Sequence, residues 1–304
     1  MNIYLTLIRR EWLQHRFGWM MLALVPLALA LLGLQFGNIQ AELDDTDPMS
    51  PMFPLLLAMG ALGGGAISIF TILSITSLFL LTGLARRDHA DRSVEFWLSL
   101  PTSHSASLGM PLLTHLLLVP AVALLVGLAG GWLVSGVLVT RMSGFGAWLA
   151  LPWGDLGAAA LAFVARVLAG LPLAVLWAAP LLLAVVLANA YLKRWGLPAL
   201  LLGVTILGWA LDYWFLGQGT VWRTLGEILR NAGHALVLNP QSIQPNHAAE
   251  GLEALRLVPS FLAQDYLLAL KALLSPLFAG CVLAAAALFA ALVDWRRRGA
   301  SAAN

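Results

Sequence analysis

The stretch FGWMMLALVPLALALLGLQFG, residues 17–37, contains no charged side chain and is long enough to cross a lipid bilayer. About 20 apolar residues in a helix cover the roughly 30 Å of hydrocarbon at the centre of a membrane. Arg9, Arg10 and Arg16 precede the stretch. It is longer than the apolar part of a cleavable signal peptide, and no small-x-small cleavage motif follows it. We therefore expect it to be retained as the first transmembrane helix.

Five more apolar segments follow this one along the chain. The six segments are 17–37, 55–84, 108–140, 158–190, 197–216 and 270–294. The whole chain is 60% hydrophobic and 11% charged, whereas soluble domains carry about 25% charged residues. Polar and apolar residues do not alternate in these segments as they do in strands. Lipid also cannot hydrogen-bond the unpaired backbone N–H and C=O groups of an open strand. We predict an all-α, polytopic membrane protein with six transmembrane helices, forming a single transmembrane domain over residues 1–304.

Basic residues are concentrated in alternate connections between these segments. Lys and Arg gather in residues 1–16, 85–107 and 191–196 and again after residue 294. The loop 38–54, in contrast, contains four acidic residues and no basic one. Because Lys and Arg mark the cytoplasmic loops of membrane proteins, we predict that both termini lie in the cytoplasm.

The longest connection, residues 217–269, is predicted to be a large extracytoplasmic segment between the fifth and sixth spans. Within it, Val221–Leu238 has the spacing of an amphipathic helix, which Pro240 would end. Its expected apolar face contains Trp222, Leu225, Leu229, Ala232 and Leu236. Two interpretations remain open: a helix lying on the membrane surface, or an external gate or partner-binding cap.

The N-terminal residues 1–16 are basic and amphipathic. They are predicted to form a cytoplasmic interface helix that lies along the inner membrane face before the chain turns into the first span. The residues that characterise this helix are Arg9, Arg10, Glu11 and Trp12. The alternative is that this segment is only a basic anchor that sets the orientation of the chain.

The chain lacks the common catalytic motifs. It contains no Walker A phosphate loop, no His-Glu-x-x-His and no Gly-x-Ser-x-Gly. Six histidines are scattered along it, and only His115 lies clearly inside a span. We expect that single imidazole to hydrogen-bond a neighbouring helix rather than to ligate a metal. We therefore expect no catalytic residue, no metal site and no nucleic-acid partner.

Two ionisable residues fall in or at the edge of the apolar segments. Arg166 lies in the fourth segment, and Asp212 ends the fifth. Charges at membrane depth are costly and usually functional. Each residue is therefore either an anchor at the membrane interface or part of a translocation path. So few buried charges argue against an ion-coupled transporter, which needs a relay of titratable groups.

The charged stretch RRDHADRSVEFWLSLP, residues 86–101, separates the second and third spans. A compact cluster of charges, formed by Asp88, Asp91, Arg92 and Glu95, is followed by apolar anchors. Aromatic side chains of this kind carry much of the binding energy at protein interfaces. The stretch therefore predicts a docking surface for a soluble cytoplasmic partner. The alternative is a solvated loop with one Trp at the level of the lipid headgroups.

Residues 91–103 resemble the cytoplasmic loop of ABC-2 type ABC transporter permeases. The matching residues are Asp91, Arg92, Ser93, Phe96, Trp97, Ser99, Leu100, Pro101 and Ser103, with Asp88 at the preceding acidic position. The chain departs from the family pattern at Glu95, at Leu98 and at Gly109-Met110. The layout of the whole chain, from an amphipathic start to a large external segment before the last span, is similar to that family as well.

The resemblance implies the permease subunit of an ATP-driven exporter in the bacterial inner membrane. Two separate ATPase subunits would bind ATP and Mg²⁺, so this chain would need no cofactor, and a second permease copy or paralogue would complete the assembly. The residues expected to couple to the ATPase are Arg86, Arg87, Asp88, Asp91, Arg92, Glu95, Phe96, Trp97, Leu100 and Pro101. The rival hypotheses are an intramembrane enzyme acting on lipid or peptide and a non-transporting membrane scaffold or sensor.

Overall fold

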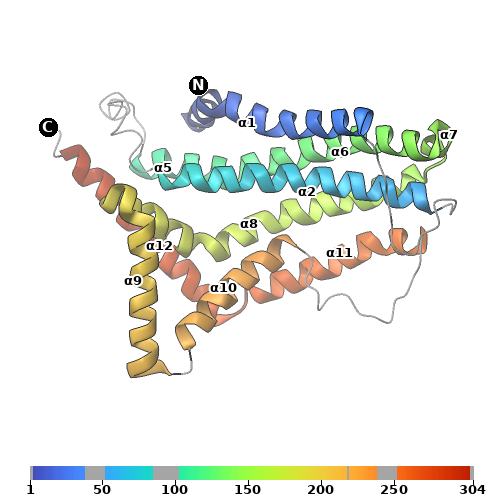
Figure 1. Ribbon diagram of the computed structural model, residues 1–304. Coiled ribbons are helices and arrows are strands. Elements are labelled where there is room, and N and C mark those ends of the chain that lie inside the picture. The colour runs from blue at the N-terminus through green and yellow to red at the C-terminus, as the bar shows by residue number, and fades with distance from the viewer. Residues whose placement is uncertain (1–2, 38–51, 85–102, 218, 238–251, 302–304) are drawn as a thin grey trace.

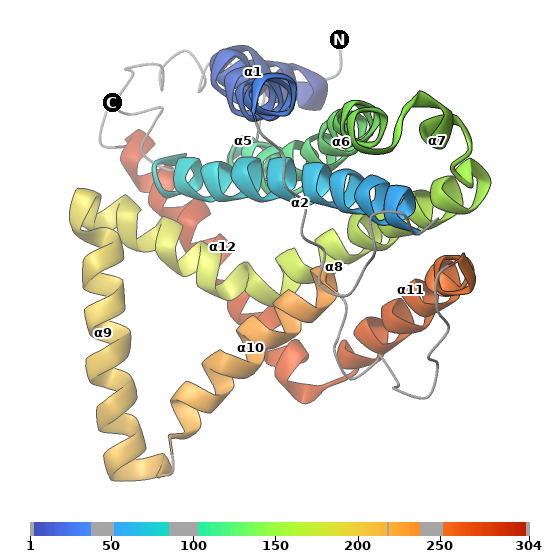
Figure 2. The ribbon, with the colours of Figure 1, turned by 45° about the vertical axis from the view of Figure 1, so that its right-hand side comes forward.

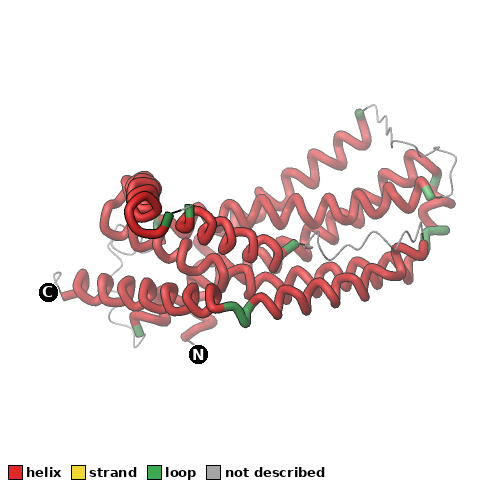
Figure 3. Tube along the Cα trace, turned by 90° about the horizontal axis from the view of Figure 1, so that it is seen from below, coloured by secondary structure: helices red, strands yellow, loops and turns green. Residues whose placement is uncertain are grey.

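The computed structural model describes residues 3–37, 52–84, 103–217, 219–237 and 252–301, and this part of the chain is helical throughout, without strands (Figure 3). The first half contains α1 (Ile3–Phe36), α2 (Phe53–Thr82), α5 (His104–Leu113), the π-helical segment η1 (Thr114–Leu118), α6 (Val119–Ser143) and α7 (Phe145–Leu149). The second half contains α8 (Trp153–Leu192), the 3₁₀ turn η2 (Lys193–Trp195), α9 (Gly196–Leu211), the π-helical segment η3 (Asp212–Leu216), α10 (Thr220–Leu236), α11 (Leu252–Ala272) and α12 (Pro276–Ser301).

Five helical runs among the described residues are long and apolar enough to cross a membrane. They are Tyr4–Phe36, Phe53–Thr82, His104–Ser143, Trp153–Phe215 and Pro276–Arg298. This confirms a polytopic helical chain. The count is one lower than the six predicted spans because the fourth and fifth predicted segments belong to one continuous run. That run turns sharply at Lys193, whose φ of 59° is the one positive value at a non-glycine residue in the described chain, and α9 then points away from α8 (Figures 1 and 2).

The last predicted segment, 270–294, is interrupted near its start. α11 ends at Ala272 and α12 begins at Pro276. Proline is favoured in the first turn of a helix because the backbone N–H that it lacks would have no partner within the helix at that position. The hydroxyl of Ser275 accepts a hydrogen bond from the backbone N–H of Phe278 at 3.2 Å. This Ser-Pro pair therefore starts a new helix within the apolar segment.

The N-terminal interface segment is continuous with the first span. α1 extends from Ile3 to Phe36 as one helix, whereas the sequence analysis expected a turn between the two parts. Glu11 is fully buried in the structure, while Arg9 and Trp12 are exposed and Arg10 is half-buried. The segment thus buries a carboxylate against its neighbours, which an amphipathic pattern alone does not predict.

The described residues of the segment 217–269 form two helices, α10 and α11, and each buries only a few side chains. Both α10 and α11 lie against the long helix α8 (Figure 1). The predicted helix over Val221–Leu238 is present as α10, but its buried face is rotated from the expected one. Ile228 and Ala235 are the buried residues of α10, whereas the expected Trp222 and Leu229 are exposed. The contact with α8 selects this face, and the sequence pattern does not contain that information.

The closest helix pair is α2 and α6, which forms the layer between α1 and α8 (Figures 1 and 2). The two backbones approach so closely that only glycine fits at the crossing. A Cβ placed on Gly131 would lie 2.7 Å from the carbonyl oxygen of Ala61, and one on Gly65 would lie 2.6 Å from the Cα of Gly131. Small residues at such positions let transmembrane helices pack tightly, because lipid provides no hydrophobic force between them.

We expect Gly131→Ala to destabilise the protein by about 1–3 kcal/mol, because the added methyl group must push the α2 backbone away. Gly64→Ala is the matched control, since a Cβ there meets nothing within 4 Å and alanine favours the helix. Thermal unfolding in detergent checks both changes. Equal melting temperatures for the two variants would contradict the tight crossing.

Candidate functional site

Among the described cations that the sequence analysis selected, Arg166 on α8 is the most deeply buried. Its side chain is 3% exposed and forms an ion pair with Asp265 of α11, with Nη2 at 2.7 Å from Oδ2. Nε donates to the same oxygen at 2.9 Å, and the guanidinium carbon lies 5.6 Å from the ring centre of Tyr266. The charge of Arg166 is therefore neutralised inside the helical assembly.

The same guanidinium group also caps the C-terminal end of α10. Nη1 donates to the carbonyl oxygen of Ala235 at 2.6 Å and Nη2 donates to that of His234 at 3.0 Å. The last four carbonyls of a helix have no partner within the helix, and the partial negative charge at this end favours a cation. One planar side chain thus donates hydrogen bonds to a carboxylate and to two backbone carbonyls. These bonds join α8, α10 and α11.

Gly170 allows this end of α10 to reach Arg166. It lies one turn after Arg166 on α8, and a Cβ at this position would overlap the carbonyl oxygen of Ala235 and lie 2.5 Å from Nη1 of Arg166. Any larger residue would therefore push α10 away from the guanidinium group.

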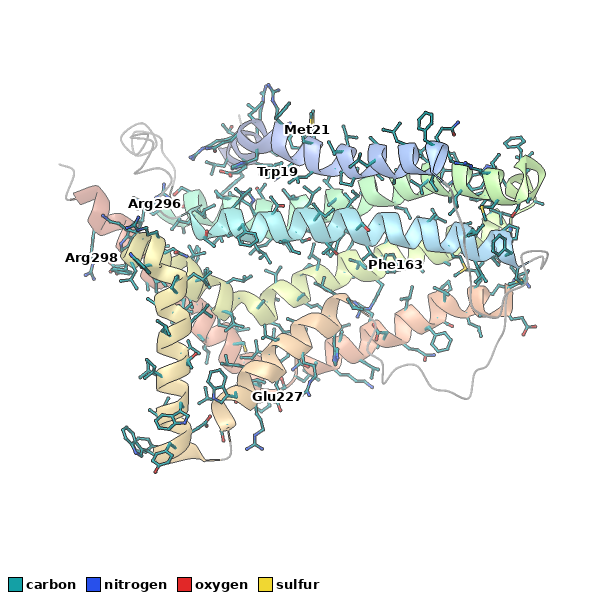
Figure 4. All side chains as sticks on the ribbon, in the orientation of Figure 1. Trp19, Met21, Phe163, Glu227, Arg296 and Arg298 are labelled. Carbon is teal, nitrogen blue, oxygen red and sulfur yellow. The ribbon has the colours of Figure 1, made fainter. Side chains whose placement is uncertain are left out.

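An apolar cavity of about 170 Å³ lies between α2, α6, α8 and α11. Its lining residues include Phe163 (Figure 4) and Leu255.

Asp212, the second ionisable residue that the sequence analysis placed either at the membrane interface or on a translocation path, caps a helix in the structure. Its Oδ1 accepts a hydrogen bond at 3.0 Å from the backbone N–H of Val221 in the first turn of α10. A side-chain acceptor at this position satisfies one of the N–H groups that a helix start leaves open. Arg166 and Asp212 are therefore not paired, and they contact opposite ends of the same helix.

We expect Asp265→Ala to cost about 3–5 kcal/mol of stability, because it leaves a buried guanidinium without its counter-ion. Arg166→Lys should also be strongly destabilising, since an ammonium group cannot reproduce the planar set of donors. Arg256→Ala provides the control. Arg256 also joins α11 to α8, through Asp155 at 3.2 Å, but its side chain is 61% exposed, so its loss should cost no more than about 1 kcal/mol. Equal shifts in detergent unfolding for Asp265→Ala and Arg256→Ala would contradict the assignment.

Asp212→Ala should cost about 1 kcal/mol through loss of the cap on α10, whereas Asp212→Asn, which keeps the acceptor oxygen, should cost less than half of this. Glu227→Ala is the control, because Glu227 is exposed (Figure 4) and its nearest described cation, Arg230, is 3.9 Å away. Unfolding in detergent compares the three variants. Equal losses for Asn and Ala at position 212 would show that charge, not capping, is the important property.

A second buried polar cluster lies between α1 and the third span. Glu11 and His115 are both fully buried, with 3.3 Å between Oε2 of Glu11 and Nε2 of His115. His15, one turn after Glu11, places its ring 5.6 Å from that of His115. The expected helix-to-helix hydrogen bond of His115 is thus present. The sequence analysis missed that Glu11 and His15 converge on it, although their four-residue spacing places both on one face of α1.

The surroundings of this cluster are apolar and aromatic. Trp19 extends from α1 toward the layer of α2 and α6 (Figure 4), with ring centres 5.5 Å from His15 and 5.7 Å from His115. His115 belongs to the π-helical segment η1, a rare distortion that is frequent at functional sites. Pro120 follows shortly after and has no N–H to donate to the preceding turn. This proline favours the irregular backbone that sets the orientation of His115.

The predicted coupling residues Arg86, Arg87, Asp88, Asp91, Arg92, Glu95, Phe96, Trp97, Leu100 and Pro101 lie outside the described residues. Their attachment points are described on both sides. α2 ends at Thr82, and α5 begins after Ser103, whose hydroxyl caps it by accepting from the N–H of Ala106 at 3.2 Å. Comparisons with protein-family models, curated proteins and solved structures gave no match.

Proposed function

We propose that this chain is the membrane subunit of an ATP-driven exporter of the ABC-2 type, with residues 86–101 as the coupling helix that contacts a separate ATPase subunit. The observation that carries the proposal is the motif of residues 91–103 between two apolar segments. The multi-pass helical architecture supports it. A bacterial inner membrane and six crossings with both termini in the cytoplasm are parts of the same proposal.

The arrangement of the helix ends supports this topology. The start of α1 and the end of α12 lie at the same end of the assembly (Figure 1), which requires an even number of crossings. Basic side chains that include Arg296 and Arg298 are found at this end (Figure 4), and basic residues favour the cytoplasmic side. Six crossings are reached when α8 and α9, which belong to one continuous run, are counted separately.

The packing of the helices on either side of residues 86–101 suggests how a movement of that segment would be transmitted to the other helices. A hydrophobic cluster joins the end of α2, the whole of α5, the second half of α8 and the end of α12. Its buried members are Leu81, Leu84, Leu108, Leu112, Leu183, Val186, Ala190, Leu292 and Val293. A rigid-body push on residues 86–101 would reach four helices through this cluster. Closure of the ATPase subunits would thereby shift the population between inward- and outward-open states.

A second permease copy belongs to the same proposal, and the surface of α9 supports it. Only Gly196 and Gly208 are buried on this helix, while large side chains such as Leu202 and Trp209 are 63% exposed. A helix that is apolar on all sides and packs so little against its own chain is suited to contact either lipid or another subunit.

We expect Trp97→Ala combined with Arg92→Glu to abolish co-purification of the chain with an ATPase subunit, because the double change removes an apolar anchor and inverts a neighbouring charge. The measurement is a pull-down from native membranes in mild detergent, followed by identification of the bound chains by mass spectrometry. Trp222→Ala combined with Arg223→Glu is the matched control, since it makes the same two changes at an exposed site on α10.

The pull-down, together with turnover and transport assays, separates the three hypotheses. An ATPase that binds the wild type and the control but not the Trp97/Arg92 variant supports the exporter. A partner without a nucleotide site would favour the scaffold or sensor. Lipid or peptide turnover by the purified chain without any ATPase would favour the enzyme. Retained ATPase binding and ATP-dependent transport by the Trp97/Arg92 variant would reject residues 86–101 as the coupling helix.

A further inference from the structure

We propose that Glu11, His15 and His115 bind one divalent transition-metal ion, of the zinc type, which joins α1 to the third span. One ligand atom from each of the three residues lies within 4.8 Å of the other two. Two imidazoles and one carboxylate form a common protein ligand set for zinc, with a fourth position left open. Imidazole nitrogen also favours zinc, iron, copper and nickel over magnesium and calcium, which prefer oxygen ligands.

The distance within the Glu11–His115 pair agrees with metal ligation. The 3.3 Å between Oε2 and Nε2 is long for a hydrogen bond to a charged group, for which about 2.7–2.9 Å is typical. Two ligands of a tetrahedral zinc ion with bonds of about 2.0–2.1 Å stand roughly 3.3 Å apart. The pair therefore already has the separation of two zinc ligands.

Neither neutral tautomer of His115 is fully satisfied by the described residues. Its Nδ1 is buried and has no hydrogen-bond partner there. If Nε2 carries the proton and donates it to Glu11, the Nδ1 lone pair is left buried and unpaired. If Nδ1 carries the proton, the Nε2 lone pair faces the carboxylate oxygen at 3.3 Å, which is repulsive. A cation between Nε2 and Oε2 converts this repulsion into two coordination bonds, while the Nδ1–H group still has no partner among the described residues.

The environment of the cluster would strengthen binding. Trp12, Trp19 and Thr114 line a cavity of about 430 Å³ next to it, and most of the other lining residues are aliphatic. An apolar shell limits the access of water and lowers the local dielectric constant, which strengthens the attraction between a cation and its ligands. The metal would fix α1 against η1, which follows α5.

The test uses the full-length chain, purified in detergent with a tag that contains no histidine. After removal of metals with EDTA, the protein is titrated with Zn²⁺, and bound zinc is counted by mass spectrometry after desalting. Competition with a chromophoric chelator gives the Kd, and substitution with Co²⁺ reports coordination geometry through its visible absorption. The variants are His15→Gln, His115→Gln and Glu11→Gln, and His234→Gln on α10 is the control.

We expect one zinc ion per wild-type and His234→Gln chain. We expect affinity to fall by more than about 100-fold in His15→Gln and His115→Gln, because even second-shell changes cost 10–100-fold. Zinc should raise the Tm of the wild type, since a ligand that binds the folded state stabilises it, but not that of His15→Gln. If His115→Gln or Glu11→Gln fails to fold, His15→Gln decides alone, because His15 is only half-buried. Absence of stoichiometric zinc in the wild type, or wild-type affinity in His15→Gln, would overturn the proposal.

Discussion

The ion pair between Arg166 and Asp265 holds together three helices of the second half of the chain, α8, α10 and α11. A guanidinium group placed this deep in an apolar assembly must be neutralised, because an unpaired buried charge would cost several kcal/mol. Asp265 on α11 supplies the counter-charge, and the open carbonyls of α10 take up the remaining donors. One side chain on α8 thereby fixes the positions of two other helices.

The first half of the chain is held together by a different force. α2 and α6 meet through glycine-lined backbones, where attraction comes from close van der Waals contact rather than from exclusion of water. A glycine-packed layer beside a polar, three-helix junction is therefore suited to rigid-body displacement of one part relative to the other.

Two contacts lie at one end of the helical assembly. The cluster around Leu108 and Leu292 joins α2, α5, α8 and α12 at the end of the assembly where α1 begins. Glu11 and His115 join α1 to the third span near the same end. A displacement applied between α2 and α5 would therefore act on both halves of the chain, and a bound metal would add α1 to the part that moves.

The sequence by itself determined that this protein is helical and crosses a membrane several times, because the length and polarity of a segment decide whether lipid can surround it. It also identified Arg166 and His115 as unusual, since polar groups at membrane depth are rare. Only the tertiary structure decided their partners. Asp265 is 99 residues from Arg166 and Glu11 is 104 residues from His115, and no local pattern encodes contacts over such distances. The buried face of α10 was likewise set by its packing against α8, which the spacing of apolar residues within α10 does not specify.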